Sequence, residues 1–505
     1  MYNNIKKNVE SSDRIAFESP NREPLSYSEL HKSLDQIKIE FLNLSINPED
    51  TVAIVLPNGP DLGLLFIACS CFAISAPLNP NYSKNEFIFY LSDLKAKFLI
   101  VDPKLKTEAS KAATELGITI IHLSPEKKAG KFNLKIDKKS SHSTIVKQNF
   151  MNNTSLLLHT SGTTSKPKLV QLTSDNLINS ALNIGRTLDL NEKDCCLNIM
   201  PLFHIHGLVA VLLSCILFNV KLVFTTGFNA LVFFKLLHQF KPTWYSGVPT
   251  MHQAILQRAK NNKKIIENNS LRFIRSSSAA MPKPVLLEME KTFNCPVIEA
   301  YGMTEASHQI ASNPLPPRVR KNGTVGIGTG PLVEIMDKEG NILEKNKVGE
   351  IVIKGETVIK QYANNEKATL SSFKNGWFKT GDLGFIDADG YIKVTGRIKE
   401  IINKGGEKIS PKEIDDVLQE MSEIEQVVCF PLSSDRYGEE IGCAIVLKEN
   451  INISEKEITE YASKHIAKFK IPSKFIFLDE IPKGPTGKLQ RIGLSEILGL
   501  ENEYK

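Results

Sequence analysis

The hydrophobic positions of the first 150 residues alternate between strand-like and helix-like patterns. Residues 52–56 and 98–101 are short apolar runs that are typical of buried strands. The apolar run 62–76 between them predicts a buried helix. Ser26 and Glu29 have the spacing of a capping box, which predicts the start of another helix. Strands that alternate with helices in this way predict layered α/β structure.

The pattern changes in the second half of the chain. Between 348 and 394 apolar and polar residues alternate with a period of two, interrupted by Asn-Gly and Asp-Gly pairs, which predicts a β-rich subdomain of hairpins. The charged, glycine-containing stretch 396–409 is interpreted as a linker. The segments beyond it predict a small α+β domain with helices at 411–421 and 454–468 and strands at 426–431 and 441–447.

The length of the chain indicates more than one domain. Its 505 residues exceed the roughly 250–300 residues at which single cores stop growing. We expect a large N-terminal domain over 1–396, built from layered α/β subdomains and the β-rich subdomain, and a small mobile α+β domain over 397–505. Residues 126–147, rich in Lys and Ser, are interpreted as a surface excursion.

Charge and composition exclude several classes of protein. A net charge of +6 is small for this length and argues against a dedicated nucleic-acid-binding protein. The eight cysteines contain no pair of C-x-x-C units, so no zinc site is expected. The first ten residues are polar, and the apolar runs 62–76 and 207–220 are shorter than the ~18–20 residues of a spanning helix. We therefore expect a cytoplasmic protein with reduced thiols and no membrane association, either monomeric or homodimeric.

A loop after the apolar run 156–158 contains the first candidate chemistry. It consists of small hydroxylated residues, one glycine and lysines: Thr160, Ser161, Gly162, Thr163, Thr164, Ser165, Lys166 and Lys168. Backbone N–H groups, hydroxyls and ammonium groups are the donors that hold a polyphosphate. The loop lacks the Gly-Lys-Ser/Thr of a Walker motif, and by itself such a cluster is more typical of a surface turn.

Further polar side chains follow other predicted strands. Two histidines, His204 and His206, precede the apolar helix, and a strand near 274–278 ends in small residues where a flat ring has room to lie. Thr304 and Glu305 follow the strand that begins at 297. Ligands in open α/β sheets bind outside the carboxyl ends of strands, so we expect these groups to converge on one crevice.

Five short motifs, in order, resemble those of the adenylate-forming superfamily of acyl-CoA synthetases, adenylation domains and luciferases. They lie at 160–168 (Thr-Ser-Gly-Thr-Thr…Pro-Lys), 301–305 (Tyr-Gly-Met-Thr-Glu), 380–382 (Thr-Gly-Asp), 396–397 (Gly-Arg) and 484–488 (Gly-Pro-Thr-Gly-Lys). Each is weak alone, but the ordered set covers nearly the whole chain. The phosphate loop departs from the superfamily at Ser165 and Leu169, where glycines are usual. Neither change removes a donor, and we expect Leu169 to reduce the flexibility of the loop.

The resemblance implies two-step chemistry that uses ATP, Mg²⁺ and CoA. A carboxylate attacks the α-phosphorus of ATP and releases pyrophosphate, and the CoA thiol then displaces AMP from the acyl-adenylate. The implied ATP-binding residues are Thr160, Ser161, Gly162, Thr163, Thr164 and Lys168 at the β- and γ-phosphates, Thr304 at the α-phosphate, Ser278, Ala279, Glu299, Ala300 and Tyr301 near adenine, Asp382 and Arg397 at the ribose, and Lys488.

The resemblance also implies the catalytic groups, which are Thr304, Glu305 and Lys488. Glu305 would bind Mg²⁺, because this hard cation prefers carboxylate and phosphate oxygens. Lys488 would bridge the attacking carboxylate and the α-phosphate, which requires a point charge on a flexible stem. The small domain would hinge near Lys399 and bring a loop to the pantetheine of CoA. The implied CoA and hinge residues are Lys399, Lys404, Gly405, Gly406 and Lys408.

Within the superfamily, the chain resembles the oxalate–CoA ligases most closely. The likeness rests on 159–165, 201–207, 305–309 with 312–317, and 402–411, whereas Tyr301-Gly302 departs from the expected Tyr-Ala. Oxalate has a second carboxylate, and burying it unpaired is costly, so the acyl pocket requires donors. The candidates are His204, His206, Ser278 and His308.

Three alternatives stay open. A CoA ligase for another small or aromatic acid would keep every nucleotide-binding residue and differ only in the acyl pocket. An amino-acid adenylation enzyme would need an acidic partner for the substrate ammonium, and no candidate is evident. A non-catalytic nucleotide-binding scaffold would be favoured by the loss of Glu305 or Lys488, and both are present.

Overall fold

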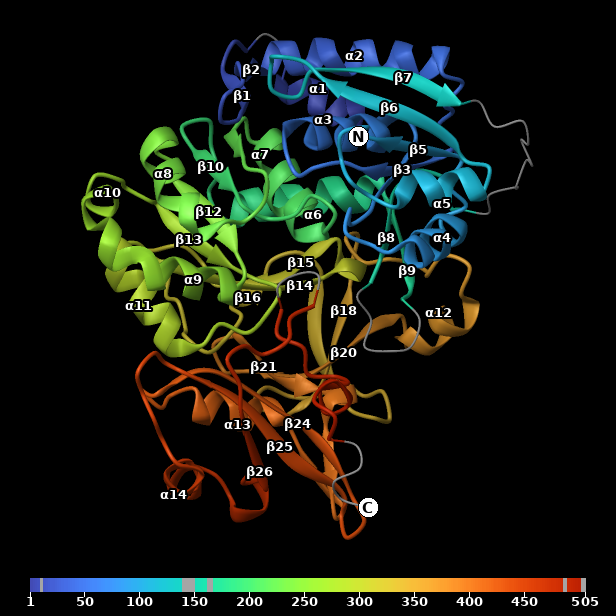
Figure 1. Ribbon diagram of the computed structural model, residues 1–505. Helices are drawn as coiled ribbons and strands as arrows, with labels where there is room; N and C mark the ends of the chain where they lie inside the picture. Colours follow the sequence, from blue (N-terminus) through green and yellow to red (C-terminus); the bar gives the residue numbers. More distant parts are fainter. Residues whose placement is uncertain (10–11, 139–149, 161–166, 485–487, 501–505) are drawn as a thin grey trace.

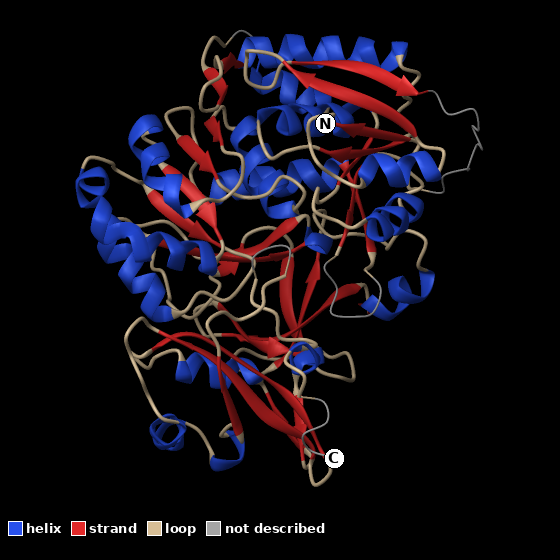
Figure 2. Ribbon diagram, in the orientation of Figure 1, coloured by secondary structure: helices blue, strands red, loops and turns tan. Residues whose placement is uncertain are grey.

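The computed structural model describes residues 1–9, 12–138, 150–160, 167–484 and 488–500. Two large sheets with their helices form the upper part of the molecule, and two smaller sheets form the centre and the base (Figure 1). Helices cover the large sheets, whereas the lower part is mostly strands (Figure 2). The predicted combination of α/β and α+β structure is confirmed.

A seven-stranded sheet contains most of the N-terminal segment. Its order is β7 (Phe132–Lys138), β6 (Thr119–Pro125), β5 (Phe98–Val101), β3 (Thr51–Val55), β4 (Ile74–Pro77), β8 (Thr154–His159) and β9 (Leu169–Thr173). The five strands between β7 and β9 are parallel, as their continuous apolar runs lead one to expect. The surface excursion predicted for 126–147 is wrong in part, because Phe132–Lys138 pairs with β6 at the sheet edge.

A nine-stranded sheet forms the second layer. Its order is β16 (Ile327–Gly328), β15 (His308–Ser312), β14 (Val297–Met303), β13 (Phe273–Ser276), β12 (Trp244–Gly247), β10 (Cys195–Asn198), β11 (Lys221–Phe224), β1 (Ile15–Glu18) and β2 (Leu25–Ser26). The strands from β1 to β14 are parallel, and β15 reverses direction after a short turn. The carboxyl ends of β12, β13 and β14 therefore lie along one edge of this sheet.

The helices pack mainly around these two sheets. They are α1 (Tyr2–Val9), α2 (Tyr27–Asn43), α3 (Pro60–Phe72), α4 (Lys84–Asp93), α5 (Ala109–Glu115), α6 (Ser174–Thr187), α7 (Ser214–Leu217), α8 (Ala230–Phe240), α9 (Pro249–Ala259), α10 (Lys263–Glu267) and α11 (Lys283–Phe293). The predicted capping box of Ser26 and Glu29 opens α2. The apolar run at 207–220 is a buried π-helix, His206–Leu213, that continues into α7.

Two five-stranded sheets follow. The first contains β17 (Leu332–Met336), β18 (Gly349–Lys354), β19 (Phe373–Lys374), β20 (Trp377–Ile386) and β21 (Ile392–Arg397), with α12 (Glu366–Ser372) at its side. The second contains β22 (Ile402–Lys404), β23 (Glu407–Ile409), β24 (Ile424–Ser434), β25 (Gly438–Leu447) and β26 (Lys474–Phe477), with α13 (Pro411–Leu418), α14 (Glu455–His465) and α15 (Leu494–Ile497).

The stretch 396–409 is not a linker throughout. β21 belongs to the first of these sheets and ends at Arg397, whereas β22 belongs to the second and begins at Ile402. Only four residues, 398–401, separate the two sheets, and three of them form a single 3₁₀ turn, Ile398–Glu400. Across the described ranges, no helix combines the length and the apolar character that crossing a bilayer requires.

Candidate active site

The phosphate loop joins the antiparallel strands β8 and β9 at a fixed base. His159 lies opposite Leu169 in the ladder, and the Thr160 N–H donates to the Lys168 carbonyl over 2.9 Å. Leu169 is a buried residue of β9, so its departure from glycine lies in a strand that anchors the loop. The loop residues themselves, Ser161, Gly162, Thr163, Thr164, Ser165 and Lys166, lie outside the described residues, and their predicted role stays a prediction.

Glu305 and Lys168 both contact Tyr362, one at its hydroxyl and the other at the face of its ring. Glu305 belongs to the 3₁₀ turn Thr304–Ala306 that follows β14 and is 7% exposed. Tyr362 donates its hydroxyl hydrogen to Glu305 Oε1 over 2.8 Å, and Lys168 Nζ lies 4.4 Å from the centre of the Tyr362 ring. Burial raises the pKa of Glu305, while the Tyr362 hydrogen bond and the Lys168 charge act against that rise. The carboxylate and the ammonium are therefore adjacent, as ligands of a metal–phosphate group must be. No sequence motif indicated Tyr362.

Asp382 connects two other predicted nucleotide-binding residues, Tyr301 and Arg397. It is 2% exposed and lies opposite Arg397 in the β20–β21 ladder. Its carboxylate accepts hydrogen bonds from Tyr301 Oη at 2.5 Å and from Arg397 Nε at 2.7 Å. The Asp382 charge raises the pKa of Arg397. A fixed carboxylate beside a guanidinium and a phenol is suited to hold the hydroxyls of a ribose.

The predicted adenine-flanking residues lie at the adjacent ends of β13 and β14. Ser277 Oγ donates to the Ala300 carbonyl over 2.9 Å, which fixes the turn where Ser278 has a left-handed φ of 73°. Ala279 is exposed and Ala300 is buried. Glu299 is buried as well, and burial raises its pKa to about 8. A hydrogen bond from the Gly323 backbone and the charge of Lys412 in α13 act against that rise.

Three residues predicted for the acyl pocket contact one another. His206 Nδ1 lies 3.0 Å from Ser278 Oγ, and the His206 and His308 rings meet edge to face with centres 4.9 Å apart. Both histidines are buried, and Nδ1 of His308 has no hydrogen-bond partner. Burial is the main cause that lowers the pKa of both rings, so both are neutral. His204 is also neutral, because burial lowers its pKa to about 3.

Lys488 lies among these groups although it belongs to the last segment of the chain. Its positive charge contributes to the lowered pKa of His204, His206 and His308. Burial, followed by the Arg397 charge, lowers the pKa of Lys488 itself to about 8. In Figure 1 the red segment of the chain rises from the base of the molecule toward β14. The predicted catalytic lysine and acyl-pocket histidines therefore belong to one site.

The residues predicted to serve CoA lie elsewhere, with one exception. Burial lowers the pKa of Lys168 at the base of the phosphate loop, and the charge of Lys399, in the turn between the two lower sheets, adds to that effect. The other four, Lys404, Gly405, Gly406 and Lys408, lie on the β22–β23 hairpin. Lys404 pairs with Glu440 at 2.8 Å, and the Gly405 N–H donates to the Tyr437 carbonyl at 2.8 Å. Lys408 lies beside Lys338. None of these contacts involves an active-site residue, and their role stays a prediction.

Comparison with known proteins assigns the family. The AMP-binding enzyme family matches residues 6–363, and the C-terminal domain of AMP-binding enzymes matches residues 413–488. The chain belongs to the AMP-binding enzyme family. Among AMP-binding enzymes it is 39% identical to the oxalate–CoA ligase of Saccharomyces cerevisiae, over 98% of this chain and 96% of that protein.

Other AMP-binding enzymes also match this chain over nearly its full length. The oxalate–CoA ligase of Arabidopsis thaliana is 39% identical over 95% of this chain and 94% of its own length. Among solved structures, ATP-bound MatB from Rhodopseudomonas palustris superposes with a TM-score of 0.88 at 25% identity, over the full length of both chains. These relatives confirm the predicted superfamily and its fold.

Proposed function

We propose that this chain is an ATP-dependent oxalate–CoA ligase. In the first step a carboxylate oxygen of oxalate attacks the α-phosphorus of ATP, forming oxalyl-adenylate and releasing pyrophosphate. In the second step the CoA thiol attacks the activated carbonyl, and AMP departs with the bridging oxygen. Two curated relatives that share 39% of their residues with this chain are oxalate–CoA ligases, which supports this acid above the others.

The observation that carries the proposal is the polar acyl pocket. Ser278, His206 and His308 supply a hydroxyl and two neutral rings where an enzyme for a fatty acid needs an apolar tunnel. A small acid with a second carboxylate requires such donors, because an unpaired buried carboxylate is costly. We assign Lys488, whose charge acts on the His308 ring, to the carboxylate that reacts.

The charges around the nucleotide fit the first step, in which two anions must meet. Catalysis of this kind depends mainly on positioning and on neutralisation of charge. We assign Lys168 to the β- and γ-phosphates, Thr304 to the α-phosphate, and Asp382 with Arg397 to the ribose. Glu305 is a buried carboxylate next to Lys168 and suits Mg²⁺, which would neutralise phosphate charge when bound.

For the second step we propose that the site is rebuilt, so that Lys488 leaves it and the thiol of CoA can approach the acyl-adenylate. We propose that residues 1–396 form a large domain and residues 397–505 a small one that turns about Lys399. Residues 398–401 are the only connection between the two lower sheets along the chain, which supports this hinge. The turn would withdraw Lys488 and bring the hairpin with Gly405 and Gly406 toward CoA.

A panel of acids tests this function. Pyrophosphate release is measured with ATP, Mg²⁺ and CoA in the presence of oxalate, malonate, acetate, a medium-chain fatty acid or 4-coumarate. We expect turnover with oxalate alone, abolished in Lys488→Ala and reduced in His308→Ala. Turnover with another acid and none with oxalate would reject oxalate as the substrate and retain the acid–CoA ligase reaction.

A further inference from the structure

Arg275 is a buried cation without an acidic partner. Its side chain lies in β13 and is 0% exposed. Within the described part of the chain, no Asp or Glu forms an ion pair with it, and its Nε has no hydrogen-bond partner. A buried charge is ordinarily paired, because desolvation of an unpaired ion costs several kcal/mol (order of magnitude). Arg275 therefore requires an explanation that packing does not supply.

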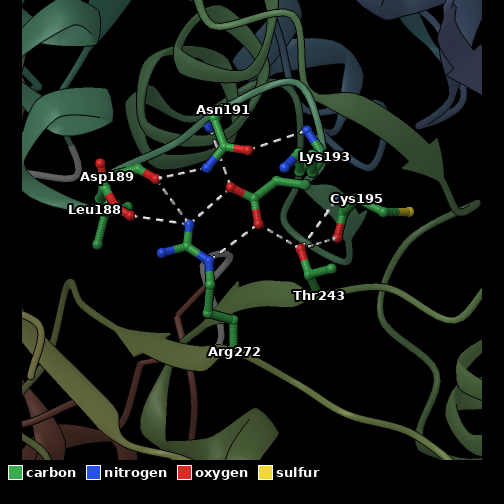
Figure 3. A network of polar contacts seen from close by, with 8 residues as sticks. Leu188, Asp189, Asn191, Lys193, Cys195, Thr243 and Arg272 are labelled. Carbon is green, nitrogen blue, oxygen red and sulfur yellow. Dashed lines mark hydrogen bonds and ion pairs between the residues drawn. The ribbon is translucent and has the colours of Figure 1, made fainter.

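Arg272, three residues earlier, shows the usual arrangement. Its guanidinium contacts the Asp194 carboxylate at 2.7 and 3.1 Å and also donates to the Leu188 and Asp189 carbonyls. Figure 3 shows Arg272 within this network, together with Asn191 and Thr243. Arg272 directly precedes β13 and Arg275 belongs to it, but among the described residues a carboxylate pairs with Arg272 and none pairs with Arg275.

Two of the three hydrogen bonds of Arg275 lead to the acyl pocket, and the third runs from Nη2 to Gln309 Oε1 at 3.1 Å. Nη1 donates to Ser246 Oγ at 3.4 Å and to His206 Nε2 at 3.3 Å, and Ser246 Oγ lies 2.7 Å from the same ring nitrogen. A guanidinium has only donors, so Nε2 of His206 must be the acceptor. The hydrogen of the neutral ring is then on Nδ1 and is donated to Ser278 Oγ over 3.0 Å.

The direction of this chain of hydrogen bonds determines whether the Ser278 hydroxyl donates or accepts. Because its oxygen accepts from His206, its own hydrogen is available to donate. Ser278 is half-buried and lies two residues beyond the end of β13. Hydrogen-bond chains polarise one another in a low-dielectric interior, and a cation at the start strengthens the last donor. The unpartnered Nδ1 of His308 lies beside the same chain.

We propose that Arg275 is a specificity-determining positioning residue that selects substrates with a second carboxylate. Its counter-ion is the non-reacting carboxylate of a small dianionic acid, held by the Ser278 hydroxyl at the end of the chain from Arg275 through Ser246 and His206. A monocarboxylate leaves the buried charge uncompensated. This inference rests on the proposed function and adds the source of its discrimination between dianions and monoanions.

The experiment compares oxalate with oxamate, which has nearly the same size and carries a neutral amide in place of the second carboxylate. The KM for oxalate, the inhibition constant of oxamate against oxalate and the KM for ATP are measured by pyrophosphate release. For Arg275→Gln we expect the KM for oxalate to rise about 10- to 100-fold, the range for loss of a charged interaction. The oxamate constant should change less than about threefold, with the KM for ATP unchanged.

Two further variants separate charge from folding. Arg275→Lys keeps the charge and should recover most of the preference for oxalate. Ser246→Ala removes only a hydroxyl, so it tests the chain of hydrogen bonds even if Arg275→Gln does not fold. We expect the same selective rise in the KM for oxalate in this variant. Arg272→Gln is the matched control, expected to lower Tm and to leave the oxalate-to-oxamate preference unchanged.

The outcomes distinguish the inference from the function on which it rests. If the role of Arg275 is purely structural, the KM for oxalate and the inhibition constant of oxamate will rise together in Arg275→Gln. That result would overturn the inference. An unchanged preference in both Arg275→Gln and Ser246→Ala would overturn it as well. A wild-type protein that is inert with oxalate and active with another acid would instead overturn the proposed function, and the inference with it.

Discussion

The hydroxyl of Tyr362 donates a hydrogen bond of 2.8 Å to Oε1 of Glu305. The same ring carries the Lys168 ammonium over its face, 4.4 Å from its centre. One tyrosine therefore orients the candidate metal ligand and the candidate phosphate ligand together. Glu305 is buried, and burial raises its pKa, while a backbone hydrogen bond, the Tyr362 hydroxyl and the Lys168 charge favour the ionised form.

Tyr362→Phe should raise the Mg²⁺ concentration required for half-maximal activity by about three- to tenfold. The variant keeps the ring under Lys168 and removes one hydrogen bond, whose typical net contribution is about 0.5–1.5 kcal/mol. The measurement is a Mg²⁺ titration of pyrophosphate release at saturating oxalate and ATP. Tyr391→Phe, which loses a bond to the Val319 carbonyl instead, is the control. Equal Mg²⁺ requirements in both variants would contradict the role of Tyr362.

The pKa of Lys488, lowered to about 8 by burial and by Arg397, predicts a pH dependence. The ammonium that binds the reacting carboxylate is lost as pH rises above about 8, so the KM for oxalate in ATP–pyrophosphate exchange should increase there. Lys488→Arg, which stays charged, should flatten this increase if it retains activity. A KM that is flat from pH 7 to 9.5 in the wild type would contradict the assignment.

The same lysine affects stability with a defined sign. Its pKa is about 8 in the folded protein and ~10.4 in an unfolded chain. Between these values the unfolded state binds more protons, so this group makes the free energy of unfolding increase with pH. Urea unfolding of wild type and Lys488→Met at pH 7.5 and 9.5 should show the larger gain in the wild type. Equal gains would indicate that Lys488 is not buried in solution.

Gly302 is the position at which the sequence departs from the Tyr-Ala expected of oxalate–CoA ligases. A Cβ at this position would lie 1.6 Å from the carbonyl oxygen of His308, on the facing strand. Gly302→Ala should therefore displace β15 with His308 and lower kcat/KM for oxalate at least tenfold, with a lower Tm. Gly328→Ala is the matched control, because its Cβ would meet only ordinary contacts at 3.4 Å or more. Similar activity in the two variants would show that His308 does not need this backbone position.

Arg491 fixes the segment that carries Lys488. It pairs with Asp415 at 2.6 Å and Glu400 at 3.0 Å, and it also donates to the Cys429 carbonyl. Arg491→Met leaves two carboxylates unpaired, which should lower the free energy of unfolding by about 3–5 kcal/mol. It should slow formation of oxalyl-adenylate more than transfer of supplied oxalyl-adenylate to CoA, because only the first step uses Lys488.

Single-turnover kinetics of the two half-reactions test this difference. Lys483→Met, which removes an exposed lysine of the same segment, is the control and should leave both steps unchanged. An equal loss in both half-reactions would contradict a positioning role for Arg491.

The features that could be predicted from the sequence are local ones. Continuous apolar runs predicted β3 and β5 within one residue, whereas the role of Lys488 beside the acyl-pocket histidines is implied by the resemblance alone. The interpretation of 396–409 as a linker failed because glycines and charges are equally typical of the β22–β23 hairpin. Likewise, the Lys-rich segment at 126–147 concealed an edge strand, since such strands tolerate polar side chains.

The residues that sequence reasoning missed act through contacts between distant parts of the chain. Tyr362 belongs to no motif, and its contact with Glu305 spans 57 positions. Ser246 and Arg275 lie in strands whose neighbours set their role, because only the sheet order brings both against His206. A single charged residue inside the buried strand Phe273–Ser276 was a signal that the sequence offered, since such residues are rarely buried without a partner.

The most direct test follows the oxygen atoms of oxalate. The wild-type protein is incubated with ¹⁸O-labelled oxalate, ATP, Mg²⁺ and CoA, and the AMP product is analysed by mass spectrometry. Attack of a carboxylate oxygen on the α-phosphorus, followed by cleavage of the acyl C–O bond, predicts one ¹⁸O atom in each AMP and an equal amount of oxalyl-CoA. Unlabelled AMP, or label released in inorganic phosphate together with ADP, would contradict the account.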